Sequence, residues 1–242
     1  MKNIFTFVLT IVSLVSYGQD TTYYDHDWKK VSFMSKAQYY EIIQRDQADT
    51  NKAIETTYFI SGQIKMQKSY SVYKDKKLDG KLKEWYENGQ IRRDIDYKDD
   101  KLNGRVLTYW DNGKPKRIDN FENDKLIDGK CINSDGKETI HYDYEKMPEF
   151  PGGINALTQY LIKEIRYPNK SRRKGIEGRV VVGFIVNKNG TMSDIKIVES
   201  VNDELDQEAM RVLNKIPKWK PGMIDGEAVR VAFNLPIKFT LN

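Results

Sequence analysis

The stretch Val229-Arg230-Val231-Ala232-Phe233-Asn234-Leu235-Pro236-Ile237-Lys238-Phe239 has an apolar residue at every second position. A strand with one buried face requires this alternation, so we predict a strand from Val229 to Phe239. Pro236 cannot donate a ladder hydrogen bond, which indicates a sheet edge or a bulge. The N–H and C=O groups along an open edge can pair with another chain, so the strand is a candidate for binding extended peptides by strand addition.

Two helices and a hairpin are predicted upstream of this strand. Apolar residues at three- and four-residue spacing indicate a helix over 154–165 that ends before Tyr167-Pro168. The β-branched run 178–186 predicts a buried strand, and Asn-Gly at 189–190 predicts a turn into a return strand over 191–200. Asn202 or Asp203 can cap the second helix, whose apolar stripe is Leu205, Ala209, Val212, Leu213 and Ile216. This order predicts an α+β domain with a three-stranded antiparallel sheet and two helices.

An internal repeat lies further upstream. The segment from Leu78 to Gln90 is followed by a near copy from Leu102 to Lys114, and Gly80 and Gly104 are 24 positions apart. Partial copies precede and follow at 58–63 and 128–137. The Asn-Gly and Asp-Gly pairs between short alternating runs predict β-hairpins, with turns at Gly80 and Gly104 among them. Because one hairpin cannot bury its own face, we predict a mostly β array of stacked hairpins that precedes the α+β domain.

The apolar start of the chain has the features of an export signal. Lys2 is followed by the apolar run 4–15, and small residues precede a cleavage site between Gly18 and Gln19. The alternative is an uncleaved membrane anchor, but the 14 residues 4–17 span about 21 Å as a helix against about 30 Å of hydrocarbon. We therefore expect a signal peptide at 1–18, an N-terminal segment of uncertain structure at 19–57, hairpin repeats at 58–140 and a C-terminal domain at 148–242.

Composition and residue inventory exclude several classes of function. The net charge of +5 comes from 40 basic and 35 acidic residues among 242, and the basic run 170–174 lacks interleaved aromatics, so we expect no nucleic-acid partner. His26 and His141 lie in different regions, and no metal-ligand spacing, nucleophile elbow or phosphate-binding loop is present. We expect no enzyme, metal or cofactor, and we place the carboxylates of the repeats at turns. Cys131 is the single cysteine and is expected to pack without a disulfide.

The repeats from Tyr58 to Glu138 resemble the MORN-variant repeats of the YwqK-like family in their glycine and aromatic spacing. The resemblance implies a stacked-hairpin array that serves as a spacer or packing platform. A surface that contacts a ligand or the envelope is the alternative, and its residues would be Trp85, Tyr86, Tyr109 and Trp110.

The segment from Pro148 to Asn242 resembles the C-terminal domain of the TonB energy-transducer family. The matching motifs are Pro-Glu-Phe-Pro-Gly-Gly at 148–153, Tyr-Pro at 167–168, Gly-Ile-Glu-Gly-Arg-Val at 175–180, Leu-Asp-Gln-Glu-Ala at 205–209 and Pro-Lys-Trp-Lys-Pro-Gly at 217–222. The resemblance implies a periplasmic peptide-binding domain. Its last strand is expected to bind the TonB box, a short extended segment of an outer-membrane TonB-dependent transporter.

The resemblance implies two groups of partner-binding residues. The first is the backbone of the last strand, at Val229, Arg230, Val231, Ala232, Phe233, Asn234, Leu235 and Lys238. The second surrounds the Tyr-Pro motif, which faces the transporter plug in the family, and comprises Arg166, Tyr167 and Pro168. The alternative for Tyr167-Pro168 is a simple helix stop.

Two features depart from the pattern of the family. An energy transducer of this type is expected to have an inner-membrane helix and a Pro-rich spacer, whereas this chain has a short apolar start and only 7 prolines. Energy-dependent transport across the outer membrane and a non-energised envelope interaction or scaffold role therefore both stay open. Inner-membrane proton-motor proteins are expected as partners only if the first 18 residues are retained. A homodimer through edge strands is a further option.

Overall fold

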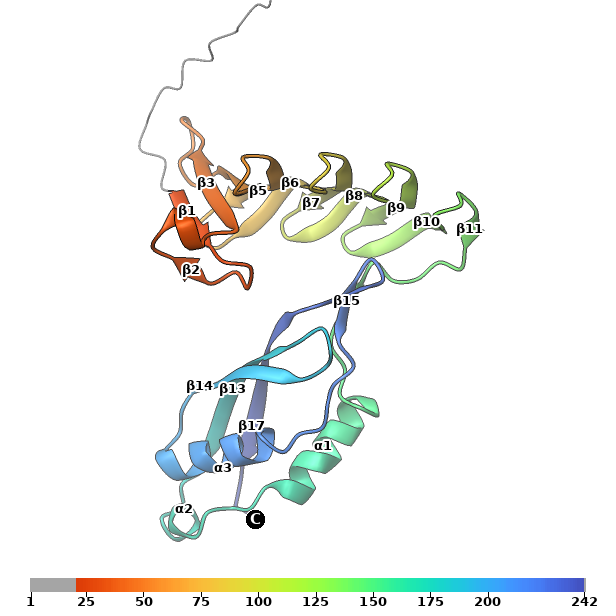
Figure 1. Ribbon diagram of the computed structural model, residues 1–242. Coiled ribbons are helices and arrows are strands. Elements are labelled where there is room, and N and C mark those ends of the chain that lie inside the picture. The colour runs from red at the N-terminus through yellow and green to blue at the C-terminus, as the bar shows by residue number, and fades with distance from the viewer. Residues whose placement is uncertain (1–20, 242) are drawn as a thin grey trace, which may run out of the picture. The chain divides into compact units, whose positions relative to one another are not determined.

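The computed structural model describes residues 21–241, which form two compact units divided between His141 and Tyr142 (Figure 1). We call residues 21–141 the repeat unit and residues 142–241 the C-terminal unit. The expected signal peptide at 1–18, with its cleavage site at Gly18 and Gln19, lies outside the described residues. Within 21–241, no helix combines the length and the apolar character needed to cross a bilayer.

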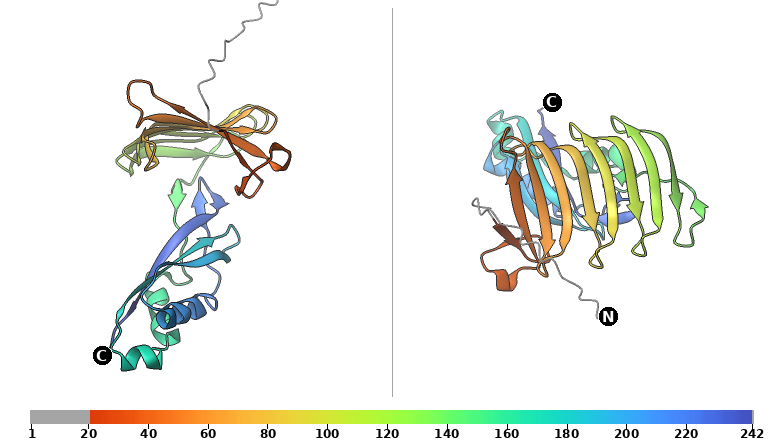
Figure 2. Two further views of the ribbon diagram at one scale, coloured as in Figure 1. Left: turned by 90° about the vertical axis from the view of Figure 1, so that its left-hand side faces the viewer. Right: turned by 90° about the horizontal axis from the view of Figure 1, so that it is seen from above.

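The repeat unit is an 11-stranded antiparallel sheet in which strands adjacent in sequence are mostly adjacent in space (Figure 2, right). The order is β11-β10-β9-β8-β7-β6-β5-β4-β3-β1-β2. The strands are β1 (Thr21–Tyr24), β2 (Lys30–Val31), β3 (Tyr39–Arg45), β4 (Ala53–Phe59), β5 (Ile64–Val72), β6 (Lys77–Trp85), β7 (Ile91–Lys98), β8 (Lys101–Tyr109), β9 (Pro115–Glu122), β10 (Lys125–Ile132) and β11 (Glu138–Thr139), with a 3₁₀ turn η1 at Met34–Lys36. The segment of uncertain structure thus supplies the first strands of the sheet.

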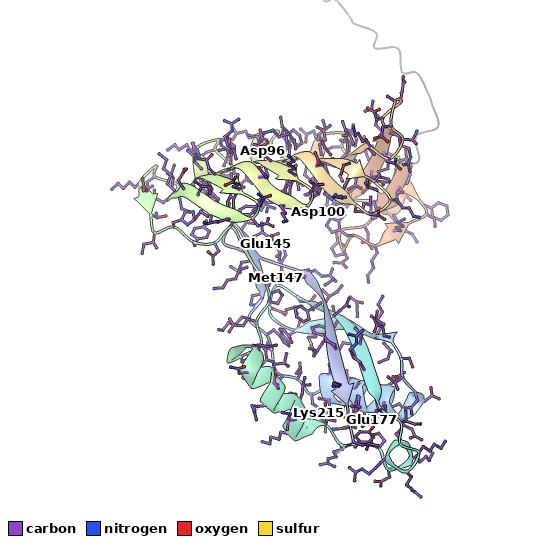
Figure 3. The ribbon with its side chains drawn as sticks, turned by 180° about the vertical axis from the view of Figure 1, so that it is seen from behind. Asp96, Asp100, Glu145, Met147, Glu177 and Lys215 are labelled. Atoms are coloured by element: carbon purple, nitrogen blue, oxygen red, sulfur yellow. The ribbon has the colours of Figure 1, made fainter. Side chains whose placement is uncertain are left out.

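The hairpin turns agree with the prediction at one end of each hairpin and differ at the other. Asn88-Gly89 turns between β6 and β7, as predicted, and the Gly89 N–H donates to Tyr86 O at 2.9 Å. The predicted turn at Gly104 is wrong, because Gly104 lies inside β8 where its register against β7 shifts. A Cβ there would lie 2.7 Å from the Cβ of Asp96. The turn instead falls at Asp99-Asp100, of which Asp100 is labelled in Figure 3. Both residues have positive φ angles.

Gly80 lies inside a strand in the same way as Gly104, one repeat earlier in the sequence. The predicted turn at Gly80 is wrong, because Gly80 lies in β6 with a φ of 103° and pairs with Tyr97. Asp100, in the turn between β7 and β8, accepts a hydrogen bond from the Leu78 N–H at 2.7 Å through Oδ1. The side chain that favours the left-handed turn therefore also connects it to the neighbouring hairpin.

Aromatic side chains connect consecutive hairpins of the repeat. The Tyr86 hydroxyl donates to Tyr109 O at 2.8 Å, and Trp110 Nε1 donates to Ile132 O at 3.0 Å. The rings are half-buried, as is Trp85. The two donors, Tyr86 and Trp110, are 24 positions apart, as the repeat requires, and their hydrogen bonds stabilise the stacking of one hairpin on the next.

Several charged side chains of the repeat unit are buried between strands. Arg117 and Asp119 are both 0% exposed, and Arg117 Nη1 donates to Asp119 Oδ2 at 2.5 Å. His141 Nε2 lies 3.0 Å from Asp119 Oδ1. Glu55 and Glu84 are also buried and ion-paired within strands. The expectation that the carboxylates of the repeats lie at turns is therefore wrong for Asp119 and Glu84.

The C-terminal unit is an α+β domain whose main sheet has the order β14-β13-β17 and is antiparallel throughout. Its elements are α1 (Gly153–Glu164), α2 (Asn169–Arg173), β13 (Gly178–Val186), β14 (Met192–Glu199), α3 (Asp203–Leu213) and β17 (Val231–Phe239). The predicted three-stranded sheet with helices is confirmed. Two elements were not predicted: the short helix α2 and a second sheet of β12 (Glu145–Lys146), β15 (Gly222–Ile224) and β16 (Glu227–Val229).

The core of the C-terminal unit lies between the main sheet and helices α1 and α3, which share one side of the sheet (Figure 2, left). The predicted cap of α3 is confirmed, because Asn202 Oδ1 accepts from the Leu205 N–H at 2.9 Å. Leu205, Ala209, Val212 and Leu213 on α3 are fully buried. Trp219 is 4% exposed, and its ring lies 5.3 Å from that of Phe233 on β17. Trp219 therefore packs beneath the last strand.

Candidate strand-binding site

Strand β17 lies at the edge of the main sheet. It pairs with β13 at nine positions, from Gly178 opposite Phe239 to Val186 opposite Val231. No other strand of the described residues pairs with its second side. Its outer backbone groups are therefore open to a further strand, in the position that Pro236 indicated.

The two faces of β17 have different roles. The side chains of Leu235, Ile237 and Phe239 are buried, and Phe233 is half-buried against Trp219. The alternate side chains are exposed, at Ala232, Asn234, Pro236 and Lys238. Of the sequence-predicted residues, Phe233 and Leu235 thus hold the strand on the core with their side chains. Ala232, Asn234 and Lys238 present both side chain and backbone.

The first two residues of the predicted strand do not lie on β17. Val229 ends β16 and pairs with Gly222, and Arg230 stands between the two strands. Arg230 Nη2 lies 3.6 Å from Asp194 Oδ2 on β14. The prediction of one continuous strand from Val229 is therefore wrong, because the chain changes pairing partner at Arg230 while its apolar alternation continues.

The Tyr-Pro motif packs within the C-terminal unit. The Tyr167 hydroxyl donates a hydrogen bond to Ile176 O, and its ring lies 5.9 Å from that of Phe239 on β17 with near-perpendicular planes. Pro168 is the residue before α2 and is half-buried. Both residues, with exposed Arg166, line an open hollow of about 600 Å³ completed by Asn169, Glu204, Gln207, Glu208 and Arg211. The motif thus ends α1 and also lines a surface hollow.

Two charged side chains of this hollow, Glu208 and Arg211, are paired with each other. Glu208 accepts from the Arg166 N–H at 2.6 Å and from Arg211 Nε at 2.7 Å. Arg211 also donates to the Glu164 carbonyl at 2.6 Å, which connects α3 to the end of α1. Burial alone would raise the pKa of Glu208, but the hydrogen bonds from Arg211 and Arg166 hold that pKa below its usual value. Glu208 is therefore an anion that fixes the α1 end.

Comparison with known proteins divides the chain in two. Residues 163–241 match the family described as Gram-negative bacterial TonB protein C-terminal. Residues 78–99 and 102–123 match the MORN repeat variant. The chain carries a TonB-type C-terminal domain and MORN-variant repeats. Both resemblances inferred from the sequence are therefore confirmed.

The relatives of the TonB-type domain are much longer than the matched segment. Protein TonB of Helicobacter pylori strain J99 is 41% identical over 77 residues, which cover 31% of this chain and 26% of that protein. Protein TonB of Vibrio cholerae is 35% identical over 79 residues, with 31% of each chain covered. The chain thus spans less than a third of these relatives. A solution structure of the Helicobacter pylori TonB C-terminal domain is 27% identical, covers 36% of this chain and 78% of that one, and has a TM-score of 0.29.

The support beneath the edge of the TonB-type domain comes from Trp219, in the Pro-Lys-Trp-Lys-Pro-Gly motif at 217–222. Gly190, in the turn between β13 and β14, accepts a hydrogen bond from the Trp219 N–H at 2.9 Å. A Cβ at Gly190 would lie 2.0 Å from the Trp219 carbonyl oxygen. The Trp219 ring lies beside Phe233. The sequence marks Trp219 by its motif and Gly190 by the Asn-Gly turn, but it does not show that the two residues are in contact. The edge strand is therefore positioned by residues distant from it in sequence.

Proposed function

We propose that the TonB-type domain binds an extended segment of an outer-membrane TonB-dependent transporter by adding it as a strand to β17. The protein would act in the periplasm, as part of energy-dependent transport across the outer membrane. The observation that carries this proposal is the unpaired edge of β17, which lies within the residues that match the TonB family.

The edge suits binding rather than catalysis. Main-chain hydrogen bonds would supply the affinity, and the exposed side chains of Ala232 and Asn234 would select among segments. The match to TonB supports a domain without catalytic activity. The periplasmic location rests on the expected signal peptide, and proton-motor proteins are partners only if that segment is retained.

Site-specific photo-crosslinking in intact cells tests the proposal. A crosslinking residue at Asn234 should form adducts with an outer-membrane transporter, mapped by mass spectrometry to one short segment of it. The matched control is Gln159, an exposed residue of α1, which should form no such adducts. Asn234→Pro should abolish the adducts formed from Ala232, because it removes a donor from the open edge, and Asn234→Ala should retain them. Equal crosslinking from Asn234 and Gln159 would rule out this edge.

The repeats support a second candidate, a non-energised envelope interaction or scaffold protein. Nine of the 11 strands of the repeat sheet, β3 to β11, pair in sequence order and form one continuous sheet. A flexible linker would not need such an extended surface, whereas a scaffold could bind partners on it.

The two candidates differ in the fate of residues 1–18. N-terminal sequencing of the mature protein should give Gln19 if the chain is released, and the scaffold role then gains support over transduction. Retention of Met1 and fractionation with the inner membrane would favour energy transduction.

A further inference from the structure

Pro236 limits what the open edge of β17 can bind. It is exposed, lies opposite Val181 of β13, and β17 continues beyond it to Phe239. Proline has no N–H and is tolerated in a sheet where its nitrogen faces away from the neighbouring strand. The nitrogen of Pro236 is therefore directed to the open edge, at a position where a partner strand needs a donor.

The alternation of a strand extends this argument to the other residues of the edge. Backbone groups of every second residue face the same side, so Ala232, Asn234 and Lys238 share the direction of Pro236. Ala232, Asn234 and Lys238 offer both an N–H and a C=O to a partner, whereas Pro236 offers only a C=O. The edge thus forms a complete ladder up to Asn234 and lacks one donor at Pro236.

We propose that Pro236 sets the length and register of the segment that β17 binds, an inference that rests on the proposed function. The segment is extended opposite residues 231–235 and leaves the edge at Pro236. A carbonyl of the segment opposite Pro236 finds no donor on β17, so pairing beyond this point gains less than pairing before it. The partner is therefore a segment of about five extended residues, roughly 17 Å long.

The test compares the full chain with its Pro236→Ala variant. The probes are blocked synthetic peptides of alternating threonine and valine with four, six or eight residues, and titration calorimetry measures their affinities. For the wild type, affinity should rise from four to six residues and then level off. The variant should bind the eight-residue peptide about two- to tenfold more tightly than the wild type, the value of one recovered hydrogen bond. Pro115→Ala, which changes an exposed proline of β9, is the matched control and should leave all affinities unchanged.

The outcomes separate this inference from the function on which it rests. If both proteins bind the peptides with the same dependence on length, the role of Pro236 is overturned and strand addition stands. If neither protein binds any peptide, strand addition fails and the inference fails with it. Sedimentation accompanies the titrations, because alanine also reopens the edge to a second copy. A dimer formed only by the variant, and dissociated by the eight-residue peptide, supports the inference.

Discussion

Replacing Gly190 with alanine should destabilise the C-terminal unit and displace the support of β17. Gly190 has a φ of +79°, and a Cβ there would lie 2.0 Å from the carbonyl oxygen of Trp219. Two costs therefore add: the left-handed backbone costs an alanine about 1–2 kcal/mol, and forcing the Trp219 segment to move costs about 1–3 kcal/mol. The expected loss in the free energy of unfolding is about 2–5 kcal/mol, a large share of the roughly 5–15 kcal/mol that stabilises a typical domain.

A matched variant separates the two costs. Gly175 also has a positive φ, of +62°, but a Cβ there would meet nothing within 4 Å. Gly175→Ala should therefore lose only the backbone contribution, about 1–2 kcal/mol. Hydrogen exchange resolved by mass spectrometry measures both variants, because peptides from 142–241 report the C-terminal unit separately from the repeats.

The internal control and the refuting result come from the same data. Peptides of the repeat unit, 21–141, should exchange at unchanged rates in both variants, since neither glycine lies in that unit. The peptides that contain Trp219 and Phe233 should lose the most protection in Gly190→Ala. Equal losses for Gly190→Ala and Gly175→Ala would show that the approach to the Trp219 carbonyl is not what positions the last strand, and would refute the reasoning.

Three other predictions concern the two units separately. Arg117→Met leaves the buried Asp119 without its arginine partner, so urea unfolding should show that the free energy of unfolding falls by about 3–5 kcal/mol. The control is Arg93→Met, which removes a side chain that is 14% exposed and should lower the free energy of unfolding less. Equal losses would contradict this account. The lowered pKa of Glu208 stabilises the fold above the unfolded pKa and ceases to do so as pH falls through the folded value. Between pH 7 and pH 3 the melting temperature of the wild type should therefore fall more than that of Glu208→Gln, and parallel curves would argue against it. Cys131 is 1% exposed, so a thiol reagent should label it only after unfolding, and rapid labelling of the native protein would show that it is not packed.

The main sheet and helices of the TonB-type domain were predictable because their signals are local. The Asn202 cap, the β-branched run of β13 and the Asn-Gly turn each act over a few residues. The start of β17 was not predictable in this way. Val229 pairs with Gly222 while Val231 pairs with Val186, yet the apolar alternation runs through both. Alternation specifies which face is buried and carries no information on which strand is the partner.

In the repeat unit, the 24-residue period predicted the hairpins. It did not predict the strands that precede the repeats or the charged residues buried between strands. The first strands belong to no repeat copy and depend on aromatic contacts instead, such as Tyr40 stacked on Tyr58 with ring centroids 4.9 Å apart. The buried pair Arg117 and Asp119 did leave a signal, since residues two apart on a strand share a face. The carboxylates of a Gly-rich repeat are typical of turns, and this more common pattern conceals the pair.

The geometry of β17 also bears on how a bound segment would be released. Nine paired positions hold β17 to β13, and buried side chains of Leu235 and Ile237 anchor it further. A bound segment would have only the outer edge, which lacks a donor at Pro236, and little core beneath it. Under tension along the strand, the segment should therefore separate before β17 leaves the sheet, because its ladder is shorter and has fewer buried contacts. Such an edge would release a bound segment under tension while the domain stays folded.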